Sequence, residues 1–334
     1  MVTETASTDG MHGPPARRGP DLFQWLTRLA AAASVFVLGW IFWEVFQEAK
    51  PALEKFGFGF LTGASWQPNR DRYGVLPFLV GTGATALIAL VLAFPPGLAI
   101  AIFLSEDFLP RPARQFVRFV VELLAAIPSV VYGLWGIFVV IPIIQTVGTW
   151  TSERFGHIPL LSGPAYGNSL LTAGVVLALM ILPTITAISR SSLVAVPHTL
   201  REGAYALGAT RWEAIFGVIL PTAAPGVVAA TILALGRAMG ETMAVAMLIG
   251  NSSRLSWSLF APSGTLASLL ANQFGEASGM QVAALMYAAL VLVALTLAVN
   301  FAGEAVLRYT ERRTAGIRCR HGQSSHACRR FFRR

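Results

Sequence analysis

The chain has 334 residues, of which 54% are hydrophobic and only 13% charged, and its mean hydropathy is +0.61. Soluble domains carry roughly 25% charged residues, so this composition excludes an ordinary soluble protein and indicates one that lies in a membrane. The net charge of +8 does not indicate nucleic-acid binding, because the nine arginines and one glutamate from Arg308 onward account for all of it. A basic segment after the last apolar segment is instead expected to contact anionic membrane lipid.

A membrane-spanning helix needs about 20 mostly apolar residues. Six windows of the sequence meet this requirement: 25–46, 76–104, 119–144, 168–189, 225–250 and 281–307. We therefore expect an all-α membrane protein with about six transmembrane helices. In this interpretation residues 1–24 are a polar leader, residues 25–307 form the transmembrane domain, and residues 308–334 are a basic tail.

The distribution of basic residues predicts the orientation of the chain, because cytoplasmic segments of membrane proteins carry an excess of Lys and Arg. If the N-terminus lies inside, 18 of the 25 basic residues fall on internal segments and 6 fall in external loops. The first window is too long for a signal-peptide core, so it is expected to stay as an anchor. Both termini are therefore expected in the cytoplasm.

The long external loop at residues 47–75 interleaves aromatic residues with glycines. Trp66 and Tyr73 in this loop are expected to act either as anchors at the membrane interface or as part of a docking surface. Several prolines inside the spans predict kinks, or a break in the second span, because each removes a helix donor. These prolines are Pro95, Pro96, Pro128 and Pro183.

The internal loop at about residues 190–224 carries the clearest local signals. Thr199 is followed three residues later by Glu202, and Thr210 is followed three residues later by Glu213. Each pair fits a capping box, in which the hydroxyl and the carboxylate satisfy backbone donors at the start of a helix. The loop is therefore expected to contain two short helices.

Gly208 lies between these two predicted helices, where a helix would end with a residue in the left-handed conformation. Pro221 is expected to close the second helix. Neither helix is long enough to be stable alone in water, so the pair must pack on the membrane domain or on another protein. Three side chains are expected to be available to such a partner: Ala204, Tyr205 and Leu207.

Two opposite charges, Arg237 and Glu241, stand inside the fifth apolar window. Residues four apart share a helix face. Each ion costs about 2.5–3.5 kcal/mol at the bilayer centre, while each Leu or Val returns about 0.3–0.6 kcal/mol, so the helix can still insert. The two ions are expected to face the bundle interior or a watery route.

Two interpretations of this pair stay open. In the first, the pair is a salt bridge that locks helix packing. In the second, the Arg237 guanidinium offers its donors to a passing oxyanion, and Glu241 keeps that binding weak enough for release. Two other helix-spaced pairs are expected to be interfacial: Arg118 with Glu122, and Glu304 with Arg308.

The sequence predicts no catalytic residue, cofactor or metal site. A phosphate-binding P-loop needs a lysine after a glycine-rich turn, and the only lysines are Lys50 and Lys55, in an expected external segment. Any ATP-driven role therefore requires a second protein. Cys319 and Cys328 accompany two histidines in the tail, but the spacing is not that of a usual zinc site, and no disulfide is expected inside the cell.

The internal loop resembles the signature of ABC importer permeases, in which Glu-Ala-Ala is followed at fixed spacing by Gly and then by Leu-Pro. The matching residues here are Glu202, Gly203, Ala204, Gly208, Leu220 and Pro221. Gly203 replaces the family's second-position Ala, and Val218 replaces its Ile. The resemblance implies a type I ABC importer permease fold, in which this loop is the coupling helix that docks on a cytoplasmic ATPase.

A narrower resemblance covers most of the chain. The strings RYGVLPFLVGT, AAIPSVVYGLWGIF and LGRAMGETMAVAMLIGN resemble the phosphate-specific permease family, and GETMAV resembles its C-type subunit. This resemblance implies uptake of inorganic phosphate across the bacterial inner membrane by a subunit that is not itself an enzyme. It also implies three partners: an A-type permease subunit, cytoplasmic ATPase subunits and a periplasmic phosphate-binding protein.

Three alternatives to phosphate uptake remain at this point. The permease could carry another oxyanion, such as molybdate or sulfate. It could be a secondary transporter that relays protons through Arg237 and Glu241, although the inverted repeats typical of that class are not visible. It could also be a membrane scaffold that transports nothing, in which the charge pair is only a lock.

Overall fold

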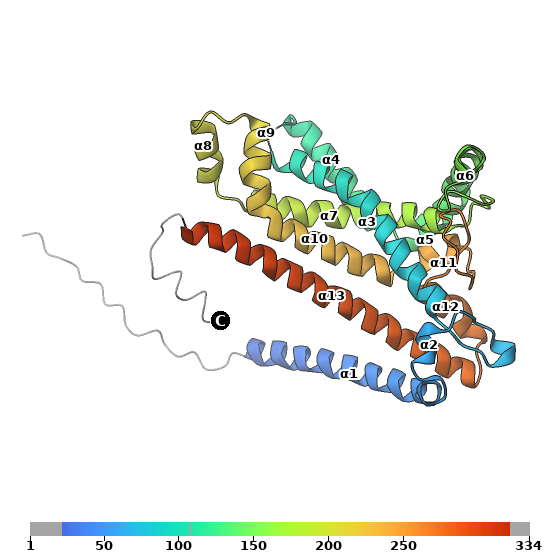
Figure 1. The fold of residues 1–334 in the computed structure, drawn as a ribbon. Coiled ribbons are helices and arrows are strands. Elements are labelled where there is room, and N and C mark those ends of the chain that lie inside the picture. Colours follow the sequence, from blue (N-terminus) through green and yellow to red (C-terminus); the bar gives the residue numbers. More distant parts are fainter. Residues whose placement is uncertain (1–21, 107, 321–334) are drawn as a thin grey trace, which may run out of the picture. The chain divides into compact units, whose positions relative to one another are not determined.

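The computed structural model of the protein describes residues 22–106 and 108–320, which form helices and loops without a β-strand (Figure 1). The predicted leader up to residue 21 and the tail beyond residue 320, with Cys328, lie outside the described residues. The side chain of Cys319 lies outside them as well. The all-α prediction is confirmed for the described part of the chain.

The helices follow one another along the chain, with the longest connections between α6 and α7 and between α11 and α12. In order they are α1 (Leu22–Phe56), α2 (Gly59–Thr62), η1 (Pro68–Arg70), α3 (Leu76–Ser105), α4 (Arg111–Ala126), α5 (Ser129–Trp135), η2 (Gly136–Val140), α6 (Ile141–Phe155), α7 (Leu170–Val194), α8 (His198–Ala206), α9 (Arg211–Ala214), η3 (Ile215–Ile219), α10 (Leu220–Gly240), α11 (Met243–Leu248), α12 (Leu266–Gln273), η4 (Phe274–Glu276) and α13 (Met280–Arg320).

Six helical runs among the described residues are long and apolar enough to cross a membrane, which confirms the predicted number of spans. These runs are Gln24–Phe56, Leu76–Ser105, Ser129–Phe155, Leu170–Val194, Arg211–Gly240 and Met280–Thr310. The second, fourth and sixth runs match the predicted windows closely. The last helix, α13, continues beyond the predicted end of the sixth span into the segment predicted as the basic tail.

The chain divides between Gln47 and Glu48 into two compact units. The described part of the first unit is the beginning of α1, a run rich in Leu, Ala, Phe and Trp that suits a helix in lipid. The second unit contains the rest of α1 and all the other described helices. Both sites considered below lie in the second unit.

The third predicted span is broken, so the expectation of one helix over residues 119–144 is wrong. Helix α4 ends and α5 begins on either side of Ile127 and Pro128, and Ile127 has an extended backbone. A residue that precedes proline is pushed out of the helical conformation, so Pro128 begins a helix instead of kinking one. The Tyr132 hydroxyl donates to the Leu124 carbonyl at 2.9 Å and so satisfies one acceptor that the break exposes.

Prolines inside the second span do not break it. Helix α3 runs without interruption through Pro95 and Pro96, so the predicted possibility of a break is wrong. The next residue, Gly97, lets α3 approach α7 closely, since a Cβ there would lie 3.1 Å from the Ile185 side chain. Thr186 on α7 donates to the Gly97 carbonyl at 3.2 Å. Close contact between α3 and α7 therefore accompanies the proline pair.

Two other prolines each follow a five-residue π-helical segment: Pro142 follows η2, and Pro221 follows η3. A proline ring clashes with the carbonyl four residues earlier, and the wider π-helical turn accommodates this clash. The backbone N–H of Leu220 accordingly bonds the carbonyl of Ile215, five residues back. The helix therefore continues past Pro221, and the prediction that this proline closes a short helix is wrong.

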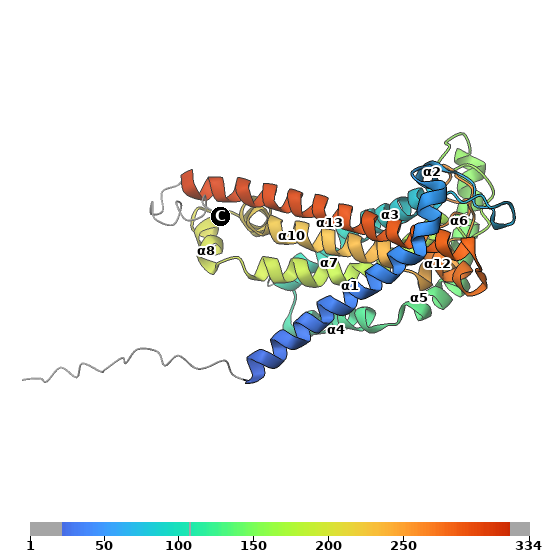
Figure 2. The same ribbon diagram turned by 90° about the horizontal axis from the view of Figure 1, so that it is seen from below.

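The long helices of the second unit form a bundle. Helix α7 packs against α3 and α10, and α10 packs against α13. In both ribbon views α8 lies at one end of this bundle, and α6 and α12 lie at the opposite end (Figures 1 and 2). The two ends of the bundle therefore carry different parts of the sequence, with the predicted internal loop at one of them.

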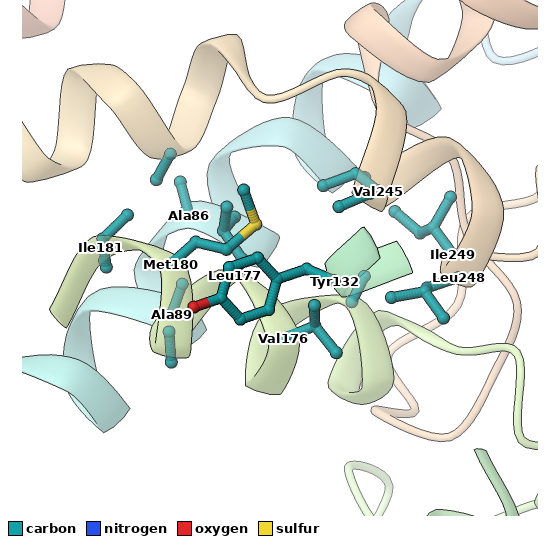
Figure 3. Packing of buried hydrophobic residues seen from close by; sticks show 14 of the residues in the cluster. Ala86, Ala89, Tyr132, Val176, Leu177, Met180, Ile181, Val245, Leu248 and Ile249 are labelled. Carbon is teal, nitrogen blue, oxygen red and sulfur yellow. The ribbon is translucent and has the colours of Figure 1, made fainter. Parts of the chain in front are cut away.

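The largest core cluster surrounds α7 and contains buried residues of α3, α5, α6, α10 and α11. The buried ring of Tyr132 lies among Val176, Leu177 and Met180 of α7, close to Val245 of α11 (Figure 3). Small residues allow this close approach: at Gly136 in η2, a Cβ would lie 2.8 Å from the Leu248 side chain. The cluster fixes the start of α5 against the bundle.

The expectation that Trp66 and Tyr73 form interfacial anchors or a docking surface is wrong. Both rings are buried, with 7% and 6% of their surface exposed. They belong to a cluster with Phe56, Phe60 and Tyr287. The indole Nε1 of Trp66 donates to Gln273 Oε1 at 2.7 Å. Burial, and the nearby charge of Asp71, raise the pKa of the Tyr73 hydroxyl.

Candidate functional site

Helix α8 forms the first part of the predicted coupling loop, and its start differs from the prediction. Pro197 is the residue before the helix, and no side chain caps it. Thr199 lies inside the first turn, so the predicted capping box of Thr199 and Glu202 is wrong. Proline fixes its own φ near the helical value, which explains how the helix can start without a hydroxyl cap.

The end of α8 matches the prediction. Gly208 has φ +85°, in the left-handed region. The N–H of Ala209 donates to the Ala204 carbonyl at 3.1 Å, and the N–H of Gly208 donates to the Tyr205 carbonyl at 2.9 Å. This pair of bonds is the Schellman motif, which satisfies carbonyls left over at a helix end. The tight turn at Gly208 is confirmed.

The second predicted capping box is also present. The N–H of Glu213 donates to Thr210 Oγ1 at 3.4 Å, and the N–H of Thr210 donates to Glu213 Oε2 at 2.7 Å. The helix that it starts is not short, because α9, η3 and α10 form one continuous run from Arg211 to Gly240. Helix α8 is therefore joined by a tight turn directly to the fifth membrane span.

The residues of the predicted coupling motif differ in exposure. Glu202, Gly203, Gly208 and Pro221 are exposed, Leu220 is half-buried, and Ala204 is buried. The prediction that Ala204 is available to a partner is therefore wrong, and its methyl group faces inward. Leu207 is 90% exposed and Tyr205 is 43% exposed. An exposed leucine and tyrosine beside a carboxylate form a small surface that a partner protein could cover.

An aromatic group holds α9 against the segment that follows α3. The ring of Trp212 stacks on Phe108 with centroids 5.1 Å apart, and on Phe216 at 5.9 Å. The guanidinium of Arg211 lies 5.9 Å from the Phe108 ring centroid. Sequence reasoning missed this group, because Phe108 is far along the chain from Arg211, Trp212 and Phe216, and none of the four belongs to a motif.

A buried ion pair was also missed. Arg201 Nη1 lies 2.7 Å from Glu106 Oε1, and only 13% and 11% of the two side chains are exposed. In the sequence Arg201 counted only as one more internal positive charge, and Glu106 carried no signal. A pair separated by 95 residues leaves no spacing pattern to detect.

Arg237 lies in the last turn of α10, not in the middle of a continuous helix over residues 225–250 as predicted. Its side chain is exposed, and Nη1 donates to Thr184 Oγ1 of α7 at 3.3 Å. Arg237 therefore links the end of α10 to α7.

Glu241 lies just beyond the end of α10, with an extended backbone at φ −70° and ψ 125°. Helix resumes only at Met243. Glu241 and Arg237 therefore do not share a helix face, which corrects the prediction from their spacing. Among the described residues no ion pair joins them.

The break after Gly240 leaves backbone carbonyls of α10 without helical partners. The partial negative charge of a helix C-terminus favours a cation in the last turn, which is where Arg237 stands. Within a membrane, non-helical backbone is tolerated only where it is covered by protein or lines a watery cavity. The arrangement can offer guanidinium and hydroxyl donors to an anion at this point of the bundle.

Comparison with known proteins assigns the chain to a family. Residues 97–316 match the family described as "Binding-protein-dependent transport system inner membrane component". The chain belongs to this family. The matched region of the permease includes α8, the tight turn at Gly208 and the Arg237 region.

Relatives narrow the assignment to the phosphate permeases. The permease is 42% identical to the phosphate transport system permease protein PstC of Mesorhizobium japonicum, over 88% of this chain and 91% of that protein. It is 43% identical to PstC of Pasteurella multocida, over 82% and 87% of the two chains. The predicted resemblance to the C-type phosphate permeases is therefore confirmed.

A solved structure supports the fold. The permease resembles a subunit of the MetNI methionine ABC transporter with a TM-score of 0.54 at 22% identity, over 74% of this chain and 99% of that one. At this identity the likeness concerns the fold alone. Together with the family, it confirms the predicted ABC importer permease fold. The permease is an inner-membrane subunit of an ABC importer.

Proposed function

We propose that this permease forms part of the route by which inorganic phosphate crosses the bacterial inner membrane. One observation carries the proposal: in a chain 42% identical to a phosphate permease, Arg237 stands exposed at the end of a broken membrane helix. Its hydrogen bond goes to a neutral hydroxyl. A guanidinium has five N–H donors, so most remain for a ligand.

Arg237 and Thr184 then act together on the oxyanion. The planar guanidinium matches the geometry of two phosphate oxygens, and the neighbouring hydroxyl can donate or accept as the proton content of phosphate requires. Glu241, beyond the helix end, carries a negative charge that lowers the affinity of the site for an anion. A transport site must bind weakly enough to release, and this balance of charges suits that need.

The proposed assembly contains a second, A-type permease subunit, cytoplasmic ATPase subunits and a periplasmic phosphate-binding protein. ATP hydrolysis belongs to the ATPase, because both lysines of this chain lie in α1 and neither follows a glycine-rich turn. The exposed surface of Glu202, Tyr205 and Leu207 on and after α8 is the proposed ATPase contact.

This contact also sets the proposed orientation. If α8 meets a cytoplasmic ATPase, the end of the bundle that carries α8 faces the cytoplasm, and the end with α6 and α12 faces the periplasm (Figure 1). An even number of spans then places both termini in the cytoplasm. The excess of basic residues on the same segments supports this orientation.

Radiolabelled phosphate uptake tests the proposal. The assembled transporter is placed in sealed, right-side-out vesicles, with ATP inside and the binding protein outside. These vesicles should accumulate phosphate, and excess molybdate or sulfate should compete poorly. Efficient competition by either would assign the permease to that oxyanion instead. Uptake that follows a proton gradient without ATP would contradict the ATP-driven mechanism.

A further inference from the structure

The buried pair of Glu106 and Arg201 joins the coupling helix α8 to the end of α3. Resting on the proposed docking of α8 to an ATPase, we infer that this pair is the positioning contact that passes movement of α8 to α3. Without it, α8 would be linked to the spans through the short segment 195–197 that follows α7, through the turn at Gly208 and through apolar packing, none of which ties it to α3 by a specific contact. With it, the second span follows α8 as well.

The burial of the pair distinguishes it from the other ion pairs. Arg118 and Glu122 lie at the same distance, 2.7 Å, but 58% and 62% of their side chains are exposed. The side chains of Arg201 and Glu106 are 13% and 11% exposed. Burying two charges costs free energy that mutual attraction repays only with good geometry and further hydrogen bonds. A buried pair holds its two elements in one arrangement, whereas an exposed pair does not.

One guanidinium connects α8 to two spans at once. Arg201 Nη1 bonds Glu106 at the end of α3, and Nη2 donates to the Leu193 carbonyl near the end of α7, at 2.8 Å. The rigid fork of arginine can reach both acceptors, whereas the single ammonium of lysine cannot hold the same geometry. The third nitrogen of the guanidinium, Nε, is buried and has no hydrogen-bond partner among the described residues. An unsatisfied buried donor lowers the stability of the folded protein.

Glu106 is itself a junction. Its N–H donates to the Ile102 carbonyl and so ends α3, and its carbonyl accepts from the Phe108 N–H at 2.9 Å. The same carbonyl accepts from Arg114 Nη2 of α4 at 3.4 Å. A pull on the Glu106 side chain is therefore applied to both α3 and the start of α4.

The elements around the pair are tied to the route for the anion. An apolar cluster of Ile102, Leu193, Val196, Ile215 and Ile219 packs the ends of α3 and α7 against η3. Helix α3 packs along α7 and α10, which carry Thr184 and Arg237. If α3 moves together with α8, the packing around the Arg237 site changes. If α3 is not held to α8, movement of α8 does not change that packing through α3.

Three charge-neutralising variants in the assembled transporter test the inference: Glu106→Gln, Arg201→Gln and the double variant. A fourth variant, Arg201→Lys, keeps the positive charge but removes the fork of donors. The matched control is Arg118→Gln with Glu122→Gln, an exposed pair of the same chemistry and distance. Three quantities are measured in vesicles: permease in the membrane, ATPase subunit that co-purifies, and phosphate transported per ATP hydrolysed.

The pair variants should keep wild-type amounts of permease and bound ATPase, but transport per ATP should fall by about 5- to 150-fold, the range of a typical coupling free energy. The double variant should be no worse than either single one, because the two residues act as a unit. Arg201→Lys should also lose coupling, although it keeps the charge. The control pair should behave as wild type.

Two results would overturn the inference. Wild-type transport per ATP in the pair variants would show that α3 follows α8 without the pair. A fall in membrane-inserted permease or bound ATPase that accounts for the whole loss would limit the pair to folding or docking. Failure of the proposed function shows separately, as absence of ATP-dependent phosphate uptake in the wild-type vesicles themselves.

Discussion

The guanidinium of Arg237 donates to the hydroxyl of Thr184, 53 residues earlier in the chain, and not to Glu241, only four residues later. The end of α10 at Gly240 separates the two charges. In a continuous helix Arg237 would form a salt bridge with Glu241, whereas here its guanidinium bonds the Thr184 hydroxyl instead. This arrangement favours an anion contact at Arg237 over a packing lock.

Replacing Arg237 with Gln should nearly abolish phosphate uptake. A hydrogen bond to a charged group contributes about 1.5–3 kcal/mol, so the loss of even one such contact slows transport by about ten- to a hundredfold. Uptake of radiolabelled phosphate, divided by the amount of permease in the membrane, measures this. Thr184→Val is the companion variant and should cause a smaller loss. Normal uptake by Arg237→Gln would reduce the residue to a structural one.

Reversing the charge of Glu202 should weaken association with the ATPase while leaving insertion intact. The carboxylate is exposed on α8, and it forms no ion pair within the part of the chain that the structure describes. A reversed charge at a contact costs about 1 kcal/mol, or roughly fivefold in affinity. Co-purification of the ATPase with Glu202→Lys measures this.

The control for Glu202→Lys is Glu153→Lys, an exposed carboxylate on α6 at the opposite end of the bundle. It should retain the ATPase fully. Equal recovery of the ATPase with both variants would argue against α8 as the docking element.

Gly208 and Gly203 offer a matched pair of glycine substitutions. A Cβ would meet no atom within 4 Å at either position, so steric contacts do not distinguish them. Gly208 has φ +85°, where an L-residue costs about 1–2 kcal/mol. Gly203 lies inside α8, where Ala stabilises a helix by about 0.5–1 kcal/mol.

We therefore expect Gly208→Ala to reduce both ATPase association and transport, because it strains the turn that ends α8. Gly203→Ala should keep or improve both, and it restores the residue that the permease motif usually has. Co-purification and uptake measure the two variants side by side. Equal losses in both would show that the left-handed turn is not what the coupling segment requires.

Trp66 should matter for stability and not for lipid contact. Trp66→Phe keeps an aromatic ring but loses the 2.7 Å bond to Gln273, at a cost of about 0.5–1.5 kcal/mol. Trp66→Ala removes a buried ring, at a cost of about 3–5 kcal/mol. Thermal unfolding in detergent should rank the proteins wild type, Phe, Ala. A Trp66→Ala protein as stable as wild type would contradict the buried position.

Local signals in the sequence predicted local structure well. The turn at Gly208 and the capping box at Thr210 depend on residues within a few positions of each other, and both are present. Six apolar runs were enough to predict six spans. The Thr199 pattern failed because Pro197 starts α8 two residues earlier.

Features that depend on the tertiary structure could not be predicted. Prolines gave the same signal everywhere, yet Pro128 separates two helices and Pro221 follows a π-helical turn inside one. Trp66 was assigned to a surface because its partner Gln273 is 207 residues away. The Glu106–Arg201 pair was invisible for the same reason.

The π-helical turn η3 has a geometric consequence for the site. A turn closed between Leu220 and Ile215 contains one residue more than an α-helical turn. Because an α-helix rotates by about 100° per residue, the extra residue changes the direction, around the helix axis, in which every later side chain of α10 points. The direction in which Arg237 projects, 16 residues after Pro221, therefore depends on the π-helical turn that accommodates this proline.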